Sequence, residues 1–145
     1  MLTKVLVFGT FDLLHLGHRW FLKAAKKYGQ KLYVSLARDK NVKKLKYHFP
    51  LQNERARLIA VRKLPYVAHA ELGAMDLKKR YDAILRINPD IICLGYDQTY
   101  LTQTLARDLK KLGLVTKIIR LKPYHPKKYK SSLLKNSKPE WRNPK

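Results

Sequence analysis

The chain has 145 residues, 46% of them hydrophobic, which is enough for one domain with a buried core and too few for two. Lysine and arginine total 32 against 10 aspartate and glutamate residues, so the formal charge is +22. A field of this sign excludes cationic partners and concentrates anions such as nucleotides, phosphates or nucleic acid.

Strand-like and helix-like segments alternate along the chain. Short apolar runs predict strands at Lys4 to Phe8, Lys31 to Leu36, Tyr66 to His69, Ile91 to Leu94 and Thr116 to Leu121. Amphipathic spacing predicts helices at Gly17 to Tyr28, Gln52 to Lys63, Leu77 to Ile87 and Leu101 to Leu112, the last closed by Gly113. This alternation predicts an α/β fold with a parallel sheet covered by helices on both faces.

The two ends of the chain differ in composition. The final segment, KPYHPKKYKSSLLKNSKPEWRNPK, is rich in Lys, Pro and Ser, so we expect one domain over residues 1–135 and a flexible basic tail over 136–145. The first residues lack a charged leader with a long apolar core, and no apolar run approaches the roughly 18 residues of a membrane span. The single cysteine, Cys93, lies in the apolar run DIICLG, as a buried thiol in a reducing compartment does. We therefore expect a cytoplasmic protein.

The stretch VFGTFDLLHLGH, residues 7–18, lies between the first strand and the first helix, where open α/β sheets bind ligands. Gly9 permits a backbone conformation, or a closeness to ligand, that a Cβ would block. Gly17 lets an anion approach the free N–H groups and the positive dipole end of the helix. His15 and His18 are three residues apart, so both rings can face one anion, donate hydrogen bonds to it and share its charge. The stretch predicts a phosphate site.

The two histidines also have a purely structural interpretation, as satisfied and partly buried side chains near a helix start. The flanking glycines, strand and helix favour the anion site instead. A metal site is not favoured, because no third or fourth His or Cys ligand is suitably spaced. Neither a P-loop nor a G-x-G-x-x-G motif is present.

The first motif resembles the signature G-[ST]-F-D-x-x-H-x-G-H of the cytidylyltransferase-like nucleotidyltransferases, which it matches at Gly9, Thr10, Phe11, Asp12, His15, Gly17 and His18. Within that superfamily the chain is similar to archaeal-type FAD synthases over residues 4 to 135, through ARDKNVKKLK, ERARLI, PDIICLGYDQ and LKKLGLVTKIIRL. Glycerol-phosphate cytidylyltransferases typically read G-D-D-W where this chain has GYDQ at 95–98. The resemblance implies a Rossmann-like, doubly wound parallel sheet of about five strands in a single domain.

The reaction that the resemblance implies transfers AMP from ATP to FMN, giving FAD and pyrophosphate, usually with Mg²⁺ across the phosphate oxygens. An FMN phosphate oxygen attacks the α-phosphorus, and because this nucleophile is already an anion, no strong general base is required. The resemblance assigns the triphosphate to His15 and His18, with His18 nearest the α-phosphate. It assigns further nucleotide contacts to Thr10, Phe11, Leu16 and Gly17. Related enzymes are often dimers, so a homodimer is a further expectation.

Basic side chains after the second strand are additional candidates. Lys43, Lys44 and Lys46 fall in an expected loop where a lysine can close over the phosphates; the sequence does not rank them, and Lys44 is our catalytic candidate. The alternative is that all three are solvated surface lysines. Arg57 matches the family arginine of the following helix and is also a catalytic candidate, although an arginine on an amphipathic helix is otherwise exposed.

Two acids have competing interpretations. Asp97 follows the strand that ends at Gly95, so its carboxylate can accept from a ribose hydroxyl or a base amine, or else cap the next helix. Asp12 can orient the histidine loop, assist Mg²⁺ or cap a helix start. Tyr124 lies beyond the last strand, where it can stack on the adenine or flavin ring.

The segment YKSSLLK resembles the start of the family's second signature, whose Ser/Thr-rich helix start holds the β- and γ-phosphates. Ser131 and Ser132 match it, although serines at a helix start are also ordinary caps. Leu133 and Leu134 stand where relatives usually have further hydroxyls, so either lysines of the preceding loop replace the hydroxyl contacts or this phosphate clamp is weak or altered.

Three functions follow from these features. FAD synthesis from ATP and FMN is the first, and a nucleotidyltransferase that uses CTP or a glycerol or sugar phosphate is the second. The third is a nucleic-acid-binding protein, because the charge of +22 and a basic tail interleaved with Tyr124, Tyr129 and Trp141 attract RNA.

Overall fold

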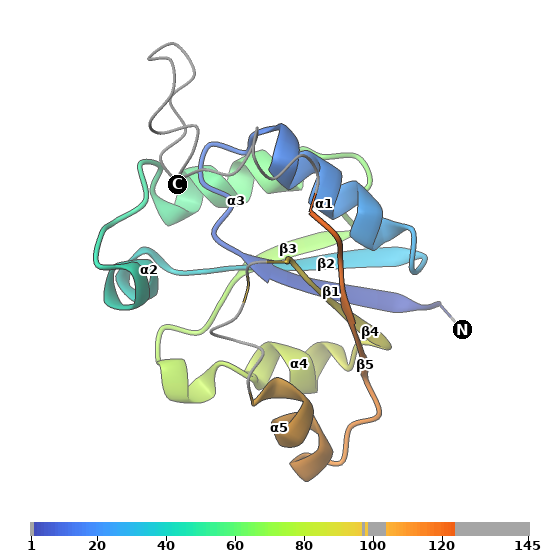
Figure 1. Ribbon diagram of the computed structural model, residues 1–145. Helices are drawn as coiled ribbons and strands as arrows, with labels where there is room; N and C mark the ends of the chain where they lie inside the picture. Colours follow the sequence, from blue (N-terminus) through green and yellow to red (C-terminus); the bar gives the residue numbers. More distant parts are fainter. Residues whose placement is uncertain (1, 97, 99–103, 124–145) are drawn as a thin grey trace.

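The computed structural model describes residues 2–96, 98 and 104–123 (Figure 1). These residues form one parallel sheet of five strands in the order β3-β2-β1-β4-β5. The strands are β1 (Lys4–Gly9), β2 (Lys31–Leu36), β3 (His69–Leu72), β4 (Ile91–Leu94) and β5 (Lys117–Arg120). The order reverses at β1, which pairs with β2 on one side and β4 on the other. The predicted α/β, doubly wound parallel sheet is thereby confirmed.

Helices cover both faces of the sheet. They are α1 (Leu16–Lys26), α2 (Asp39–Lys46), α3 (Glu54–Arg62), the short 3₁₀ helix η1 (Leu77–Lys79), α4 (Asp82–Ile87) and α5 (Leu105–Lys111). Val5 and Val7 of β1 pack on α1 and α3, whereas Leu6 between them packs on α4 and α5. All three are fully buried, because successive side chains of a central strand point to opposite, covered faces.

Several predicted boundaries are wrong, and each has a local cause. The third strand begins at His69 rather than Tyr66, because a turn closed by Val67 N donating to Leu64 O comes first. The helix predicted over residues 77–87 is two pieces, η1 and α4. Asp76 caps η1, and the Tyr81 hydroxyl donates to Asp108 on α5 at 2.6 Å, which fixes the start of α4 against its neighbour.

The segment after β2 also differs from the prediction. The sequence predicts a loop at Lys43, Lys44 and Lys46, yet these lysines lie in α2, which starts after Arg38 and ends at Tyr47 in a left-handed conformation. Asn41 and Val42 are its buried residues, so only one apolar side chain of the helix is buried. The spacing of apolar residues is therefore too weak a pattern to predict a helix here.

Some of the remaining expectations fall within the described part of the chain. Cys93 is fully buried, and this burial raises the pKa of its thiol to about 11. In the described ranges, no helix is long and apolar enough to cross a membrane. Residues 101–103 of the last predicted helix, the basic tail at 136–145 and the aromatic residues Tyr129 and Trp141 lie outside the described residues.

Gly113 closes α5 as predicted. Its φ is +74°, its N–H donates to Lys110 O, and Leu114 N donates to Leu109 O, which together form a Schellman motif. Nothing lies within 4 Å of the position where a Cβ would stand. Backbone strain alone therefore opposes a side chain here.

We expect Gly113→Ala to lower the free energy of unfolding by about 1 kcal/mol, because alanine is strained at positive φ. Gly113→Asn should lose less, since asparagine tolerates the left-handed region. Urea denaturation of the three proteins measures both changes. An alanine variant as stable as the parent would contradict this account of the helix end.

Candidate functional site

The turn between β1 and α1 lies at the carboxyl edge of the sheet, next to the point where the strand order reverses. A Cβ on Gly9 would stand 2.6 Å from ring atoms of Phe11. The space that a side chain at this position would occupy is therefore filled by the protein's own ring. Phe11 is buried, packs edge-on against the His18 ring and stacks on the Phe21 ring.

The backbone of this turn is strained. Phe11, Leu13 and Leu14 all have positive φ, at 54°, 58° and 26°. For residues other than glycine, each such conformation costs roughly 1–2 kcal/mol. A turn of this kind persists only where the surrounding structure holds it in place.

The side chains of Asp12 and Gln52 hold the turn after β1 in this conformation. The buried carboxylate of Asp12 accepts from Leu51 N at 2.8 Å and Gln52 N at 2.9 Å, while Oε1 of Gln52 accepts from Leu13 N at 2.9 Å. Of the roles considered for Asp12, orientation of the histidine loop is the one that these bonds support, because both carboxylate oxygens face backbone N–H groups. The role of Gln52 was not predicted, since no pattern in the sequence distinguishes a glutamine that bonds a distant turn.

Arg57 ties the same turn to its neighbours. It lies on α3 and is fully buried, so the interpretation as an exposed helix arginine is wrong. Its guanidinium donates to Thr10 O at 2.8 Å, to Ala37 O at 2.9 Å, to Gln52 O at 3.1 Å and to the Asp39 carboxylate at 2.6 Å. These bonds join the segments that follow β1 and β2. A direct contact of Arg57 with substrate stays a prediction.

His15 and His18 form a reciprocal cap at the start of α1. Nδ1 of His15 accepts from Gly17 N at 3.0 Å and His18 N at 3.4 Å, and Nδ1 of His18 accepts from His15 N at 3.2 Å. The rings stack with centroids 3.6 Å apart and planes 19° from parallel. Two neighbouring cationic rings would repel each other at this distance.

This cap determines where each imidazole carries its proton. A nitrogen that accepts a hydrogen bond is unprotonated, so both neutral rings carry the hydrogen on Nε2. Each ring is therefore a neutral donor at Nε2, beside the positive end of α1 and the half-exposed side chain of Leu16. The structure thus supports hydrogen-bond donation to an anion, and it makes the sharing of a full positive charge by both rings less favourable than the sequence indicated.

The three candidate lysines occupy different faces of α2. Lys46 Nζ lies 3.4 Å from Thr10 Oγ1, beside the first motif. Lys43 Nζ bonds Tyr47 O, and Lys44 is exposed. The structure therefore brings Lys46 rather than Lys44 to the turn, because the helix that the sequence did not predict determines which lysine faces inward. A catalytic role for Lys44 stays a prediction.

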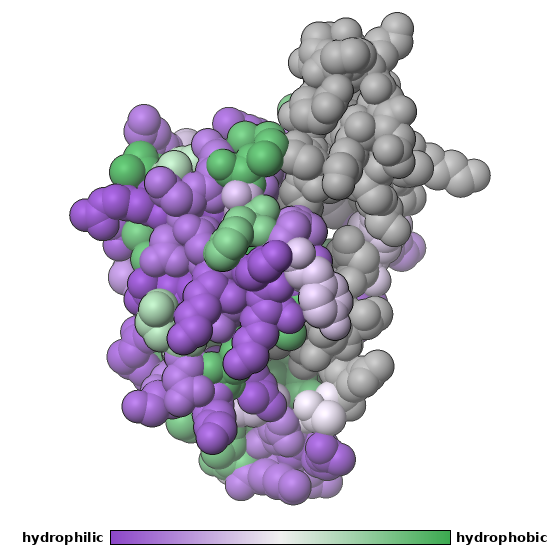
Figure 2. Space-filling view, turned by 90° about the vertical axis from the view of Figure 1, so that its left-hand side faces the viewer, coloured by the Kyte–Doolittle hydropathy of each residue, from purple (hydrophilic) through white to green (hydrophobic). Residues whose placement is uncertain are grey.

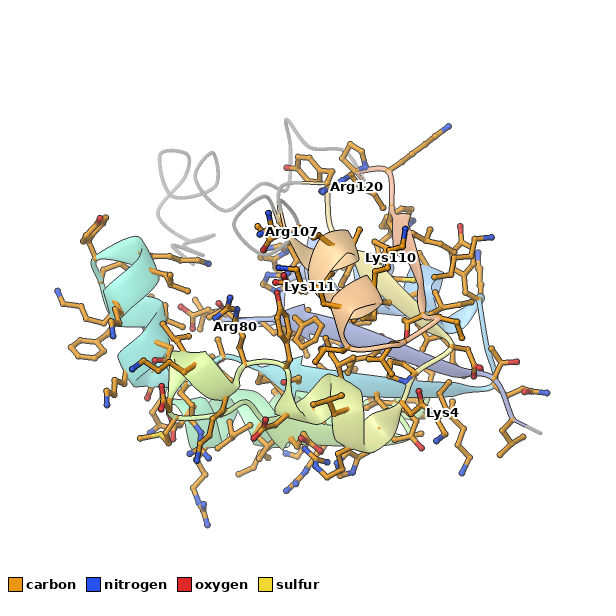
Figure 3. All side chains as sticks on the ribbon, turned by 90° about the horizontal axis from the view of Figure 1, so that it is seen from below. Lys4, Arg80, Arg107, Lys110, Lys111 and Arg120 are labelled. Carbon is orange, nitrogen blue, oxygen red and sulfur yellow. The ribbon has the colours of Figure 1, made fainter. Side chains whose placement is uncertain are left out.

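The segment after β4 is joined to β1 by a glutamine. Gln98 Nε2 donates to Phe8 O at 2.8 Å, and Gln98 Oε1 accepts from Gly95 N at 2.7 Å. Arg120, at the end of β5 (Figure 3), donates to Gly95 O at 2.8 Å. In the sequence, Gln98 stood out only as part of the motif GYDQ. In the structure its side chain bridges the ends of β1 and β4. Asp97, Tyr124, Ser131 and Ser132 lie outside the described residues, so their nucleotide contacts stay predictions.

A mostly apolar cavity of about 100 Å³ opens beside the same strand ends. Phe8 and Gly9 of β1 contribute to its wall, as do residues of β2, α2, η1, α4 and α5. Its apolar side chains include Leu36, Leu45, Leu77, Tyr81, Ile84 and Leu105. The cavity therefore adjoins the turn between β1 and α1 and suits an apolar or aromatic group rather than a charged one.

Comparisons with known proteins agree with this geometry. A family model described as cytidylyltransferase-like matches residues 6–137. The FAD synthase of Aciduliprofundum boonei is 41% identical over 123 residues, which span 85% of this chain and 80% of that protein. The FAD synthase of Methanosarcina mazei is 44% identical over 121 residues, or 83% of this chain and 78% of that protein.

A solved structure is similar over the whole fold. The crystal structure of the lipopolysaccharide core biosynthesis protein from Thermoplasma volcanium GSS1 superposes with a TM-score of 0.76 and 38% sequence identity. The match covers 86% of this chain and 99% of that one. The Rossmann-like fold that the first motif implied is therefore also the fold of a relative.

We expect Asp12→Asn to lower the free energy of unfolding by about 1–3 kcal/mol, because an amide NH₂ would face a backbone N–H that the carboxylate now accepts. The exposed Asp76, which caps η1, provides the matched control. Asp76→Asn should change stability by less than about 0.5 kcal/mol, because asparagine caps as well as aspartate. Equal effects of the two substitutions in urea denaturation would refute the role given to Asp12.

Proposed function

This chain belongs to the cytidylyltransferase-like family, as its first motif predicts, and on that premise we propose that it transfers the adenylyl group of ATP to FMN, forming FAD and pyrophosphate. The relatives named FAD synthase, about 40% identical over more than four fifths of the chain, support this activity. The observation that carries the proposal is the adjacency of a histidine-capped helix start and an apolar cavity at one sheet edge. The helix start suits a polyphosphate, and the apolar cavity suits a flavin ring.

The reaction needs two anions brought together rather than a strong base. A phosphate oxygen of FMN attacks the α-phosphorus of ATP in line, a new P–O bond forms, and the bond from the α-phosphorus to the bridging oxygen of the β-phosphate breaks. The electron pair of that bond leaves on pyrophosphate. The site must therefore position the two substrates and stabilise the charge that gathers on the leaving group.

The side chains around the turn supply these effects. Nε2–H of His15 and His18 donates to the phosphate oxygens, and the N-terminus of α1 adds its dipole, since its Gly17 and His18 N–H groups already donate to His15 Nδ1. Lys46, beside Thr10, adds a full positive charge at the same edge. Because the Nδ1 atoms are already used as cap acceptors, the rings are aligned before the substrate arrives.

Mg²⁺ belongs to this reaction as a companion of the nucleotide. In the described part of the chain no group of three or more His, Cys, Asp or Glu side chains is placed to hold a metal ion. The Asp12 carboxylate is committed to backbone N–H groups. Magnesium readily binds phosphate oxygens and water, so we infer that the phosphates of ATP would hold the ion, which would offset part of their charge.

The cavity favours FMN over small acceptors. At about 100 Å³ the cavity is smaller than one of about 150 Å³ that binds benzene, so it can take only the methyl-bearing edge of the flavin, with the rest of the ring outside. Glycerol phosphate has no group that gains from an apolar wall. Arg38 and Arg80, also in the lining, can face the polar side of the acceptor.

Chromatographic analysis of the purified protein with Mg²⁺, FMN and either ATP or CTP tests the reaction. We expect FAD and pyrophosphate from ATP and FMN, and no product from CTP. Parallel reactions with glycerol phosphate and sugar phosphates test the alternative acceptors. Consumption of glycerol phosphate with CTP, in the absence of FAD formation, would replace this proposal with the second function.

Two substitutions of His18 distinguish its role as a helix cap, through Nδ1, from its proposed role as a hydrogen-bond donor, through Nε2. Asn can retain an acceptor near the Nδ1 position but has no group near Nε2, whereas Gln can retain a donor there. We expect His18→Asn to lower kcat by about 100- to 1,000-fold and His18→Gln by much less. His69→Asn, at the exposed start of β3, should leave kcat unchanged. A His18→Asn variant with full activity would remove this ring from the mechanism.

Leu45→Trp tests the flavin subsite. The half-exposed Leu45 lines the cavity, and a larger ring there should fill it. We expect the KM for FMN to rise about tenfold or more while the KM for ATP stays within about twofold, since the loss of one well-filled apolar contact is worth roughly 1–3 kcal/mol. Ile59→Trp, equally exposed on α3, is the matched control. Equal changes in both KM values would contradict a flavin site here.

A further inference from the structure

The outward side of α2 faces away from both the turn after β1 and the cavity. Asn41 and Leu45 face the cavity and Lys46 faces Thr10, so the inner sides of the helix serve the site. The opposite side carries what we term the α2 surface, which consists of Lys40, Lys43, Lys44, Tyr47 and Phe49. Figure 2 shows the face of the molecule that bears α2, where hydrophilic side chains surround scattered apolar ones.

Two aromatic rings are exposed on this surface. Tyr47 is 84% exposed and Phe49 61% exposed, which is unusual for rings that gain by burial. Tyr47 also adopts a left-handed conformation, with φ of 65°, at the end of α2. Lys43 bonds its carbonyl oxygen at 3.1 Å and lies over the Phe49 ring at 5.7 Å. The turn is therefore ordered, with its rings presented to solvent.

Among the residues that the structure describes, no ion pair involves a lysine of the α2 surface. Residues 40–53 contain no aspartate or glutamate. The flanking carboxylates, Asp39 and Glu54, are already bound by Arg57 and Arg38. A second copy of this chain carries the same charge of +22 and would be repelled. The partner that fits must be a polyanion with flat apolar groups.

We propose that the α2 surface binds single-stranded RNA, with Lys40, Lys43 and Lys44 on its phosphates and the rings of Tyr47 and Phe49 stacked on unpaired bases. Lysine contacts to phosphate supply affinity that depends on salt, and base stacking on aromatic rings supplies affinity that does not. A duplex keeps its bases stacked inside, so it cannot use the rings. This activity is additional to nucleotidyl transfer and does not depend on it.

Fluorescence anisotropy of the full chain with a labelled twelve-nucleotide oligouridylate tests the proposal. One double variant, Lys40→Gln with Lys43→Gln, removes charge, and another, Tyr47→Ser with Phe49→Ser, removes the rings. The control is Lys110→Gln with Lys111→Gln, which removes two exposed charges from α5, an element apart from α2 (Figure 3). A duplex of the same length is the second probe.

The two variants should differ in how salt affects them. Loss of the lysines should lower the slope of log affinity against log salt by about 1.4 units, since each phosphate contact on a single strand contributes roughly 0.7. Loss of the rings should weaken binding by roughly tenfold per ring at fixed salt and leave the slope unchanged. The control should stay within about twofold of the parent, and the duplex should bind more weakly.

Three results would overturn the proposal. The first is a control that weakens binding as much as the lysine variant does, which would show a diffuse field only. The second is a duplex that binds as tightly as the single strand. The third is a ring variant that raises the KM for FMN without changing RNA affinity, which would assign the turn to the acceptor. We expect FAD synthesis by the ring variant to stay within about twofold of the parent. An absence of FAD synthesis in the parent protein would refute the proposed enzyme and leave the RNA measurement valid.

Discussion

The Asp12 carboxylate, which accepts two backbone N–H groups from residues 51 and 52, is the interaction on which the rest of the site depends. The turn that it anchors contains three residues at positive φ, and nothing local to that turn makes this conformation favourable. Oε1 of Gln52 accepts a hydrogen bond from Leu13 N, and the guanidinium of Arg57 donates one to Thr10 O. Strain in the turn is thus offset by contacts about 40 residues away in sequence.

Ordering this turn has a chemical consequence. It delivers the chain to α1 with His15 as the cap, and the reciprocal bonds between His15 and His18 then use both Nδ1 atoms. The remaining donor of each ring is Nε2–H, next to a helix start that attracts anions. Because Arg57 also donates to Ala37 O beyond β2, the turn between β1 and α1 and the wall of the apolar cavity belong to one hydrogen-bonded unit. The two substrates of a transfer reaction can therefore be held in a fixed relation.

Much of the frame could be predicted from the sequence, because strands buried on both faces are continuous apolar runs. The bounds of β2 and β4 agree with the prediction residue for residue, and the first motif was placed at the correct edge of the sheet. What could not be predicted depends on distant contacts. The helix α2 has one buried apolar residue, so its existence and the inward position of Lys46 were invisible. The burial of Arg57 follows from partners on three segments, which no local pattern records.

Long-range ¹H–¹⁵N NMR of the imidazole rings tests the central claim, that a strained turn presents two neutral histidines as Nε2 donors to a polyphosphate. The account predicts that His15 and His18 are both protonated at Nε2, and that a non-hydrolysable ATP analogue with Mg²⁺ shifts both Nε2 resonances while the Nδ1 resonances keep their positions. Protonation at Nδ1 in either ring, or Nε2 resonances that do not respond to the analogue, would contradict it.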